Sequence, residues 1–307
     1  MSGAGALLGA ELRRFFSRRL MRAALALGIT VATVVLVIQI VRSEVSSETQ
    51  THTTFECTAP SFDGAPPTVD GAPPSFSSPK DCVPGEVTVQ VVHDRRLRIH
   101  DTYSDTVKGT GFGMVFVAFV LGASFVGAEF GAGSLSTQLL FDPRRYRVIA
   151  VKALGVGIGL AVLSVVVLLY IGLLQWAGSS WRGIVGDLDG GWFASRAGDI
   201  GRVTGATALS GIAAYAITVI TRRTVAAVAG LLIIGWVSAI IGSFDSWRWI
   251  AKYNPASAFI AMVADVTNNN GADEDVLAVR GATVSACLWA IGLTALAGVI
   301  FSRREVR

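Results

Sequence analysis

Charged residues are scarce in this sequence of 307 residues: only 16% are Asp, Glu, Lys or Arg, whereas 52% are hydrophobic. A soluble domain has about 25% charged residues, so this chain lacks the polar surface that a water-soluble fold needs. Apolar runs of about 18 residues or more indicate transmembrane helices, because about 20 helical residues cross a bilayer core of about 30 Å. Several such runs occur here. The composition therefore predicts a polytopic membrane protein.

Catalytic motifs are missing as well. The sequence contains neither G-x-x-x-x-G-K-[ST], the phosphate-binding loop of many ATPases, nor the G-x-S-x-G elbow of serine hydrolases. No histidine falls in an apolar run, which excludes an intramembrane H-E-x-x-H metalloprotease, and no ligand pattern for a metal links His52, His93 and His100. No basic stretch is interleaved with aromatic residues, as a nucleic-acid site would need. We expect a chain that is not an enzyme and binds neither metal nor nucleic acid.

The apolar runs predict an all-α fold with six transmembrane helices. The expected spans cover residues 23–41, 112–128, 153–177, 203–220, 225–243 and 281–301. The first run is too long for the apolar core of a signal peptide, and no A-x-A cleavage site follows it before Arg42, so we interpret it as a retained helix. Ionisable residues are nearly absent from the spans, which disfavours an ion-coupled secondary transporter.

The distribution of basic residues predicts that both termini are cytoplasmic. An even number of spans places the termini on one side. If that side is cytoplasmic, the inner segments hold 14 of the 26 Lys and Arg residues, as the positive-inside rule requires. The short turn TRRT at 221–224 and the tail 302–307 are the clearest markers. We therefore expect a multi-pass protein of the plasma (inner) membrane, embedded in the lipid bilayer.

The longest connection, residues 42–111, is expected to be an extracytoplasmic loop. It is rich in Ser, Thr and Pro and contains the string DGAPP twice, a composition that does not easily form a packed core. Residues 85–101 alternate apolar and polar side chains, which is typical of a half-exposed strand, so a small β-containing lobe is expected. Cys57 and Cys82 bracket the Pro-rich stretch. Because disulfides persist outside the cytoplasm, we predict a Cys57–Cys82 bond.

The last outer segment, residues 244–280, contains the apolar string PASAFIAMVADV, which begins at Pro255. The string is too short to span a bilayer. Proline is favoured at the first position of a helix, so we expect a re-entrant or interfacial helix that begins at Pro255.

Small residues recur inside the spans, notably Gly122 and Gly127 in the second and Gly155, Gly157 and Gly159 in the third. The string GVGIGL is similar to a dinucleotide-binding loop, but no strand precedes it and it lies within a span. Glycines at such spacings let transmembrane helices approach closely. We predict that these residues form helix-packing surfaces.

The first 22 residues predict an amphipathic helix. One side carries the apolar residues Leu8, Leu12, Phe15 and Phe16, and Glu11, Arg14 and Arg18 fall mostly on the other. A helix with arginines on its polar side is expected to lie flat in the cytoplasmic leaflet. A basic N-terminus that only sets the topology is the alternative.

The segment between spans two and three, residues 129–152, carries more than topology requires. It begins with Glu129 and continues through two glycines that permit a tight reversal. A short helix-compatible stretch then carries Leu135 and Leu139 one turn apart, and Pro143 ends it. The arginines that follow would suffice for topology, as they do in TRRT. The additional helix-forming residues therefore favour a docking surface for a partner.

These residues resemble the first cytoplasmic loop of ABC-2-type transporter permeases. The resemblance is carried by Glu129, Gly133-Ser134-Leu135, Leu139-Leu140, Pro143 with Arg144 and Arg145, and Lys152. The six-span layout, the amphipathic N-terminal helix and the proline-opened helix before the last span look similar too. The first outer loop is longer than is usual in that family.

The resemblance implies a permease subunit of an exporter for hydrophobic or amphipathic substrates. The loop would form a coupling helix that docks on a separate ATP-binding subunit, which binds ATP and Mg, so this chain would hold no cofactor. Two permease copies, or this chain and a paralogue, would alternate between inward- and outward-facing states. The implied docking contacts are Leu135, Leu139 and Phe141, and the residues that would link docking to the spans are Glu129, Arg144 and Arg145.

A second class of function stays open from the sequence alone. A non-transport scaffold or sensor could use the disulfide-closed outer loop to bind a ligand or an envelope partner. Co-purification with an ATPase that carries the Walker motif distinguishes the two, because only the permease requires one.

Overall fold

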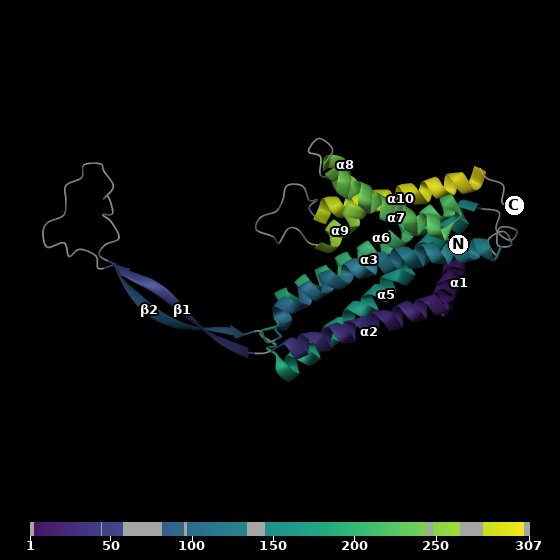
Figure 1. Cartoon of the computed structure of the whole chain (residues 1–307). Helices are drawn as coiled ribbons and strands as arrows, with labels where there is room; N and C mark the ends of the chain where they lie inside the picture. Colours follow the sequence, from purple (N-terminus) through teal and green to yellow (C-terminus); the bar gives the residue numbers. More distant parts are fainter. Residues whose placement is uncertain are drawn as a thin grey trace. The chain divides into compact units, whose positions relative to one another are not determined.

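A computed structural model describes residues 3–43, 45–57, 82–94, 97–133, 145–242, 244, 248–264 and 279–303. The chain divides into two compact units (Figure 1). The larger unit is helical and comprises Met1–Ile40 and Leu97–Arg307, and the smaller unit comprises Val41–Arg96. The helical unit contains the candidate site.

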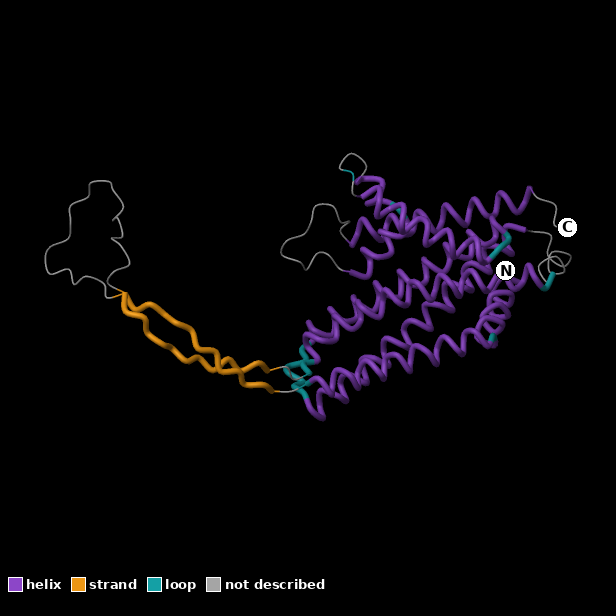
Figure 2. The backbone as a smooth tube through the Cα atoms, in the orientation of Figure 1, coloured by secondary structure: helices purple, strands orange, loops and turns teal. Residues whose placement is uncertain are grey.

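Five helices are long and apolar enough to cross a membrane. They belong to α2 (Arg19–Arg42), α3 (Ile99–Gly131), α5 (Arg145–Arg182), α6 (Gly190–Thr221) and α10 (Val279–Arg303), shown as purple tubes in Figure 2. By helix length and hydropathy the chain is a multi-pass membrane protein, as the composition predicted. The membrane-crossing part that the structure describes is entirely helical, which confirms the expected fold class at that level.

The sixth expected span, residues 225–243, coincides with α7 (Thr224–Gly242). The helix α7 has 19 residues, and the apolar stretch described within it is Thr224–Val237. Five helices of the described chain are long and apolar enough to cross a membrane, and the six-span topology stays a prediction.

The helix α3 begins at Ile99, although the corresponding span was expected from residue 112. Its first turns carry polar residues such as Asp105, which hydropathy assigns to a loop. Two buried apolar side chains, Leu97 and Ile99, fix this start. The amide of Ile184, just after α5, donates to the carbonyl of Leu97 at 2.9 Å. Tertiary contacts thus extend the helix beyond its apolar run.

The central helix of the larger unit is α6, which contacts α3, α5, α7, α9 (Pro255–Ala264) and α10. Its neighbours approach closely at glycines. A Cβ on Gly122 of α3 would collide with the carbonyl oxygen of Gly211 in α6, and a Cβ on Gly157 of α5 would collide with Ile212. The packing role predicted for small residues in the spans is confirmed at these positions.

The expected short helix before the last span is α9, and Pro255 is its first residue. Asn254 caps it, because the amide of Ser257 donates to Asn254 Oδ1 at 2.9 Å. Phe259 and Met262 are buried, and α9 contacts α10 and α6. A short helix α8 (Arg248–Tyr253) precedes it. The re-entrant or interfacial position of α9 in a bilayer stays a prediction.

The smaller unit contains a two-stranded antiparallel sheet of β1 (Val45–Cys57) and β2 (Cys82–Asp94). A strand was expected within residues 85–101, and the observed strand ends at Asp94. The register pairs Val45 with Asp94 at one end and Cys57 with Cys82 at the other. The two cysteines are therefore direct cross-strand neighbours. Residues 58–81, which contain the repeated string, lie outside the described part of the chain.

This register supports the predicted disulfide. Opposite residues of an antiparallel pair have Cα atoms about 4.5–5.5 Å apart, and disulfides span about 4.4–6.8 Å. We predict a Cys57–Cys82 bond whose loss in Cys57→Ser destabilises the smaller unit by about 3 kcal/mol. Peptide mapping without reductant checks it, with Cys287→Ser of α10 as a control that keeps the linked peptide. Two free thiols in the native protein would contradict the assignment.

Candidate functional site: a buried charge cluster

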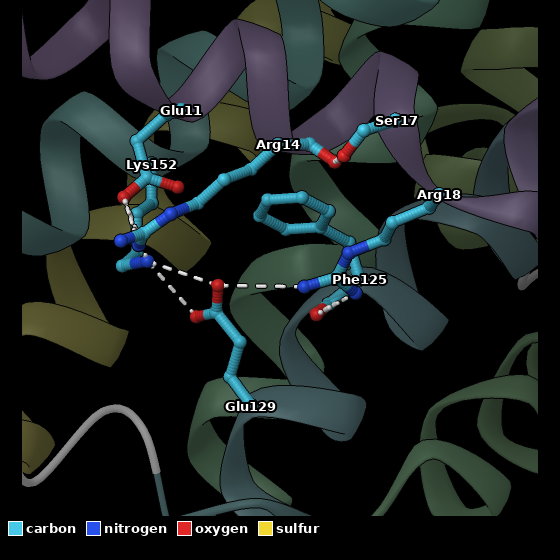
Figure 3. A network of polar contacts seen from close by, with 7 residues as sticks. All are labelled: Glu11, Arg14, Ser17, Arg18, Phe125, Glu129 and Lys152. Atoms are coloured by element: carbon cyan, nitrogen blue, oxygen red, sulfur yellow. Dashed lines mark hydrogen bonds and ion pairs between the residues drawn. The ribbon is translucent and has the colours of Figure 1, made fainter.

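Charged side chains converge where α1 (Gly3–Ser17), the end of α3 and the beginning of α5 meet (Figure 3). Lys152 of α5 is at the centre. Its Nζ donates to Glu11 Oε1 of α1 at 3.1 Å and to Glu129 Oε1 of α3 at 3.0 Å, and it lies 2.9 Å from Glu129 Oε2. The three residues are 1%, 2% and 5% exposed, respectively. One ammonium group thus joins three helices inside the protein.

Arg18, in the bend between α1 and α2, is a second cation for Glu129. Its Nη2 lies 3.5 Å from Glu129 Oε1, and its Nη1 donates to the carbonyl of Phe125 at 2.7 Å. The guanidinium also lies over the Phe125 ring, 4.1 Å from the centroid. Burial lowers the pKa of Arg18, and the carboxylates of Glu129 and Glu11 oppose this shift. Arg14, which is largely exposed, lies 3.5 Å from Glu11.

Two glycines of α5 allow α1 to approach. A Cβ on Gly155 would lie 3.4 Å from the Cβ of Glu11, and a Cβ on Gly159 would collide with the ring of Phe15. Phe15 is buried and packs against Phe125 of α3 with ring centroids 5.3 Å apart. The glycines predicted to form a packing surface therefore bring Glu11 within reach of Lys152.

The side of α1 that faces the protein differs from the expected amphipathic pattern. Glu11 was expected on the polar side, but it is buried, and it lies with Leu8 and Phe15 on the side that contacts α5. Lys152 is the reason, because it supplies a countercharge from a distant part of the chain. Phe16 is 40% exposed, and Leu12 is partly buried. The interfacial position of α1 stays a prediction.

Because the charged groups are buried, breaking their contacts costs considerable free energy. The two carboxylates and the ammonium sum to one negative charge, which Arg18 balances. A buried charge is tolerated when it is paired and hydrogen-bonded, and removal of one partner costs about 3–5 kcal/mol. A movement of α1, α3 or α5 that separated these charged groups would cost a similar free energy.

The residues expected to couple to an ATPase fall into two sets. Glu129 is in the cluster, Gly133 follows α3 with a left-handed φ of 65°, and Arg145 begins α5. Glycine reaches this conformation without steric cost, and it ends the helix. The predicted coupling helix lies outside the described residues. The other expected coupling residues lie there as well: Leu135, Leu139, Phe141, Pro143 and Arg144.

Two residues of the charge cluster, Glu11 and Phe125, were not predicted from the sequence to belong to this site. Glu11 was visible as the one acidic residue in a basic N-terminal segment, which is a weak signal. Phe125 gave none, because an aromatic residue in an apolar span is ordinary. Within the described part of the chain, no group of three or more His, Cys, Asp or Glu side chains could hold a metal ion. In this cluster, the Lys152 ammonium group contacts both carboxylates.

A scan against protein-family models finds no match to this sequence, and a search of curated proteins finds none either.

Five of the described basic residues used to orient the chain lie at the cluster end of the helical unit. Tyr146 of α5 hydrogen-bonds Ser302, near the end of α10, at 2.8 Å. Near the end of α3, Gly127 lies against Thr224, the first residue of α7. Arg14, Arg18, Arg147, Arg222 and Arg303 belong to these converging ends. This grouping supports the prediction that they face one side of the membrane.

We predict that Lys152→Met lowers the free energy of unfolding by about 3–5 kcal/mol, because it leaves two buried carboxylates without their shared cation. Thermal unfolding of the purified protein measures the loss. Lys108→Met is the matched control: it makes the same change in α3, where the described residues form no ion pair with Lys108. Equal shifts in melting temperature for the two variants would contradict a structural role for the cluster.

Proposed function

We propose that this chain is the permease subunit of an ATP-driven transporter of the ABC-2 type, which exports a hydrophobic or amphipathic substrate. A separate ATP-binding subunit docks on residues 129–147, and two permeases form the transport unit. The observation that carries the proposal is the buried Glu11–Lys152–Glu129 contact. It ties both ends of the proposed docking segment to the N-terminal helix.

The cluster suits the transmission of force from a docked partner. The segment leaves α3 at Gly131, two residues after Glu129, and enters α5 at Arg145, about two turns before Lys152. A force that the partner exerts on the docking segment acts on α3 and α5, because the segment connects these two helices. The Lys152–Glu129 pair prevents their ends from separating, and Glu11 adds α1 to the same moving body. In the proposed mechanism α1, α3 and α5 therefore move together when ATP binds to the partner.

Two further features support this reading. The residues that carry the family resemblance include both Glu129 and Lys152, and these two are in direct contact. The sequence itself contains no phosphate-binding loop, which favours a partner as the source of the energy for transport. The converging basic ends of the helices are consistent with a cytoplasmic location of the docking segment.

The test is affinity purification of the tagged full-length chain from its native membrane. We expect an ATPase with a Walker motif to co-purify, with an ATPase rate that changes when this chain is present. The double variant R144E/R145E is expected to lose either the association or the effect on the rate. The matched control is R222E/R223E, which reverses the same charges in the turn between α6 and α7.

An R144E/R145E protein that keeps both the association and the effect on the ATPase rate would contradict docking at this segment. Purification that yields no Walker-motif ATPase would contradict the transport function itself. It would then favour the scaffold or sensor that uses the outer loop.

A further inference from the structure

An apolar cavity of ≈ 410 Å³ lies between α2, α3, α5 and α6, and it is open along α2, where Leu27 and Val31 are 59% and 51% exposed. Along α2 it extends from Ala24 to Val35, which is about 17 Å at 1.5 Å per residue. None of its lining residues is ionisable. The wall is made of aliphatic and small residues, among them Val31, Met114, Leu163 and Val167. The cavity is separate from the charge cluster, whose charged residues do not line it.

Two glycines of α3 create this space. Gly109 and Gly113 are one turn apart and both line the cavity, and a Cβ at either would meet no atom within 4 Å. The glycines that pack against other helices differ from these two, because a Cβ on Gly122 or Gly159 would collide with a neighbouring helix. Gly109 and Gly113 therefore leave room that no described part of the chain fills.

A polar network closes one end of the cavity. Gln39 Nε2 of α2 and Gln175 Nε2 of α5 donate to Thr106 Oγ1 at 3.3 and 2.6 Å. The Thr106 hydroxyl donates its single hydrogen to the carbonyl of Thr102 at 2.9 Å. Thr106 can therefore only accept from the two amides, and each amide must turn its NH2 group toward it.

This arrangement leaves two acceptors unused. Gln39 Oε1 and Gln175 Oε1 are buried and have no hydrogen-bond partner among the described residues, and Gln175 is only 2% exposed. Together with Thr106, Ala32 and Val35, the two glutamines line a void of ≈ 10 Å³, about the size of one hydroxyl group. Thr106, Ala32 and Val35 also line the large cavity. Buried acceptors without a donor are unfavourable, so a donor is needed at this end.

We propose that the cavity binds a single-chain, uncharged amphiphile whose head-group hydroxyl donates its one hydrogen to the buried Gln175 Oε1, in the void that Gln39 also lines, and whose acyl chain lies along α2. An anionic head group would face the two amide oxygens, and a cationic one would find no carboxylate in the lining. The length of the cavity along one helix fits one chain. This inference does not rest on the proposed ATP-driven transport, because it concerns binding to the chain alone.

The test is native mass spectrometry of the purified full-length chain titrated with monomyristoylglycerol, methyl myristate or myristate. The three probes share one chain and differ in the head group. We expect monomyristoylglycerol to bind about tenfold more tightly than methyl myristate, the factor that one net hydrogen bond supplies. Myristate is expected to bind more weakly than monomyristoylglycerol.

Variants distinguish the part of the cavity that binds the acyl chain from the part that binds the head group. Gly113→Leu fills the cavity and is expected to weaken binding of monomyristoylglycerol and methyl myristate at least tenfold, and Gly109→Leu does the same independently. Gln175→Leu is expected to abolish the preference for monomyristoylglycerol while binding of methyl myristate persists. Gly201→Leu, at an exposed position of α6 where a Cβ also meets no atom, is the matched control and is expected to bind as the unaltered chain does.

Equal affinities of the unaltered chain for monomyristoylglycerol and methyl myristate would overturn the head-group assignment and point to non-specific occupation by bilayer lipid. Unchanged binding in both glycine variants would overturn the location. Absence of binding of any probe would overturn the site and leave a water molecule as the donor to the two glutamines.

Discussion

The contact on which this arrangement depends is the pairing of Lys152 with Glu11 and Glu129. Apolar side chains gain little from helix association in a bilayer, because lipid tails are as apolar as they are. A buried ammonium group is different, since it is stable only where carboxylates meet it. Glu11, Glu129 and Lys152 come from three different helices, and the observed placement of these helices brings the three charges into contact. Gly155 and Gly159 allow that placement by letting α1 approach α5.

The same helices are tightly joined at one end and loosely packed farther along. At the cluster, Phe15 and Phe125 are buried and pack against each other, and the charged groups of Glu11, Glu129 and Lys152 are buried beside them. Farther along α2 and α3, Gly109 and Gly113 face an open cavity. Because α3 and α5 contribute to both regions, a movement of these helices relative to α2 or α6 changes the walls of the cavity. The proposed coupling segment and the proposed amphiphile site are thus connected by shared helices, even though each is argued from separate contacts.

Sequence patterns predicted the features that depend on local composition. The apolar runs located five membrane-crossing helices, Pro255 located α9, and alternation located part of β2. Long-range pairings were not predictable in the same way. Glu11 was assigned to the polar side of its helix because nothing local indicates that Lys152 would cover it. Nothing in the sequence distinguishes the role of Gly109 from that of Gly159. In the structure Gly109 faces a cavity, and Gly159 faces the ring of Phe15. Glu129 and Lys152 were selected by resemblance, and their direct contact emerged from the structure.

A double-mutant cycle between Glu129→Gln and Lys152→Met tests the central claim most directly. The unfolding free energies of the two single variants, the double variant and the unaltered chain give the interaction energy of the pair. The account predicts about 2 kcal/mol or more, because residues within one buried ion network are strongly coupled. A parallel cycle between Glu129→Gln and Lys108→Met is expected to be additive within about 0.5 kcal/mol. Additivity in the Glu129–Lys152 cycle as well would contradict the account.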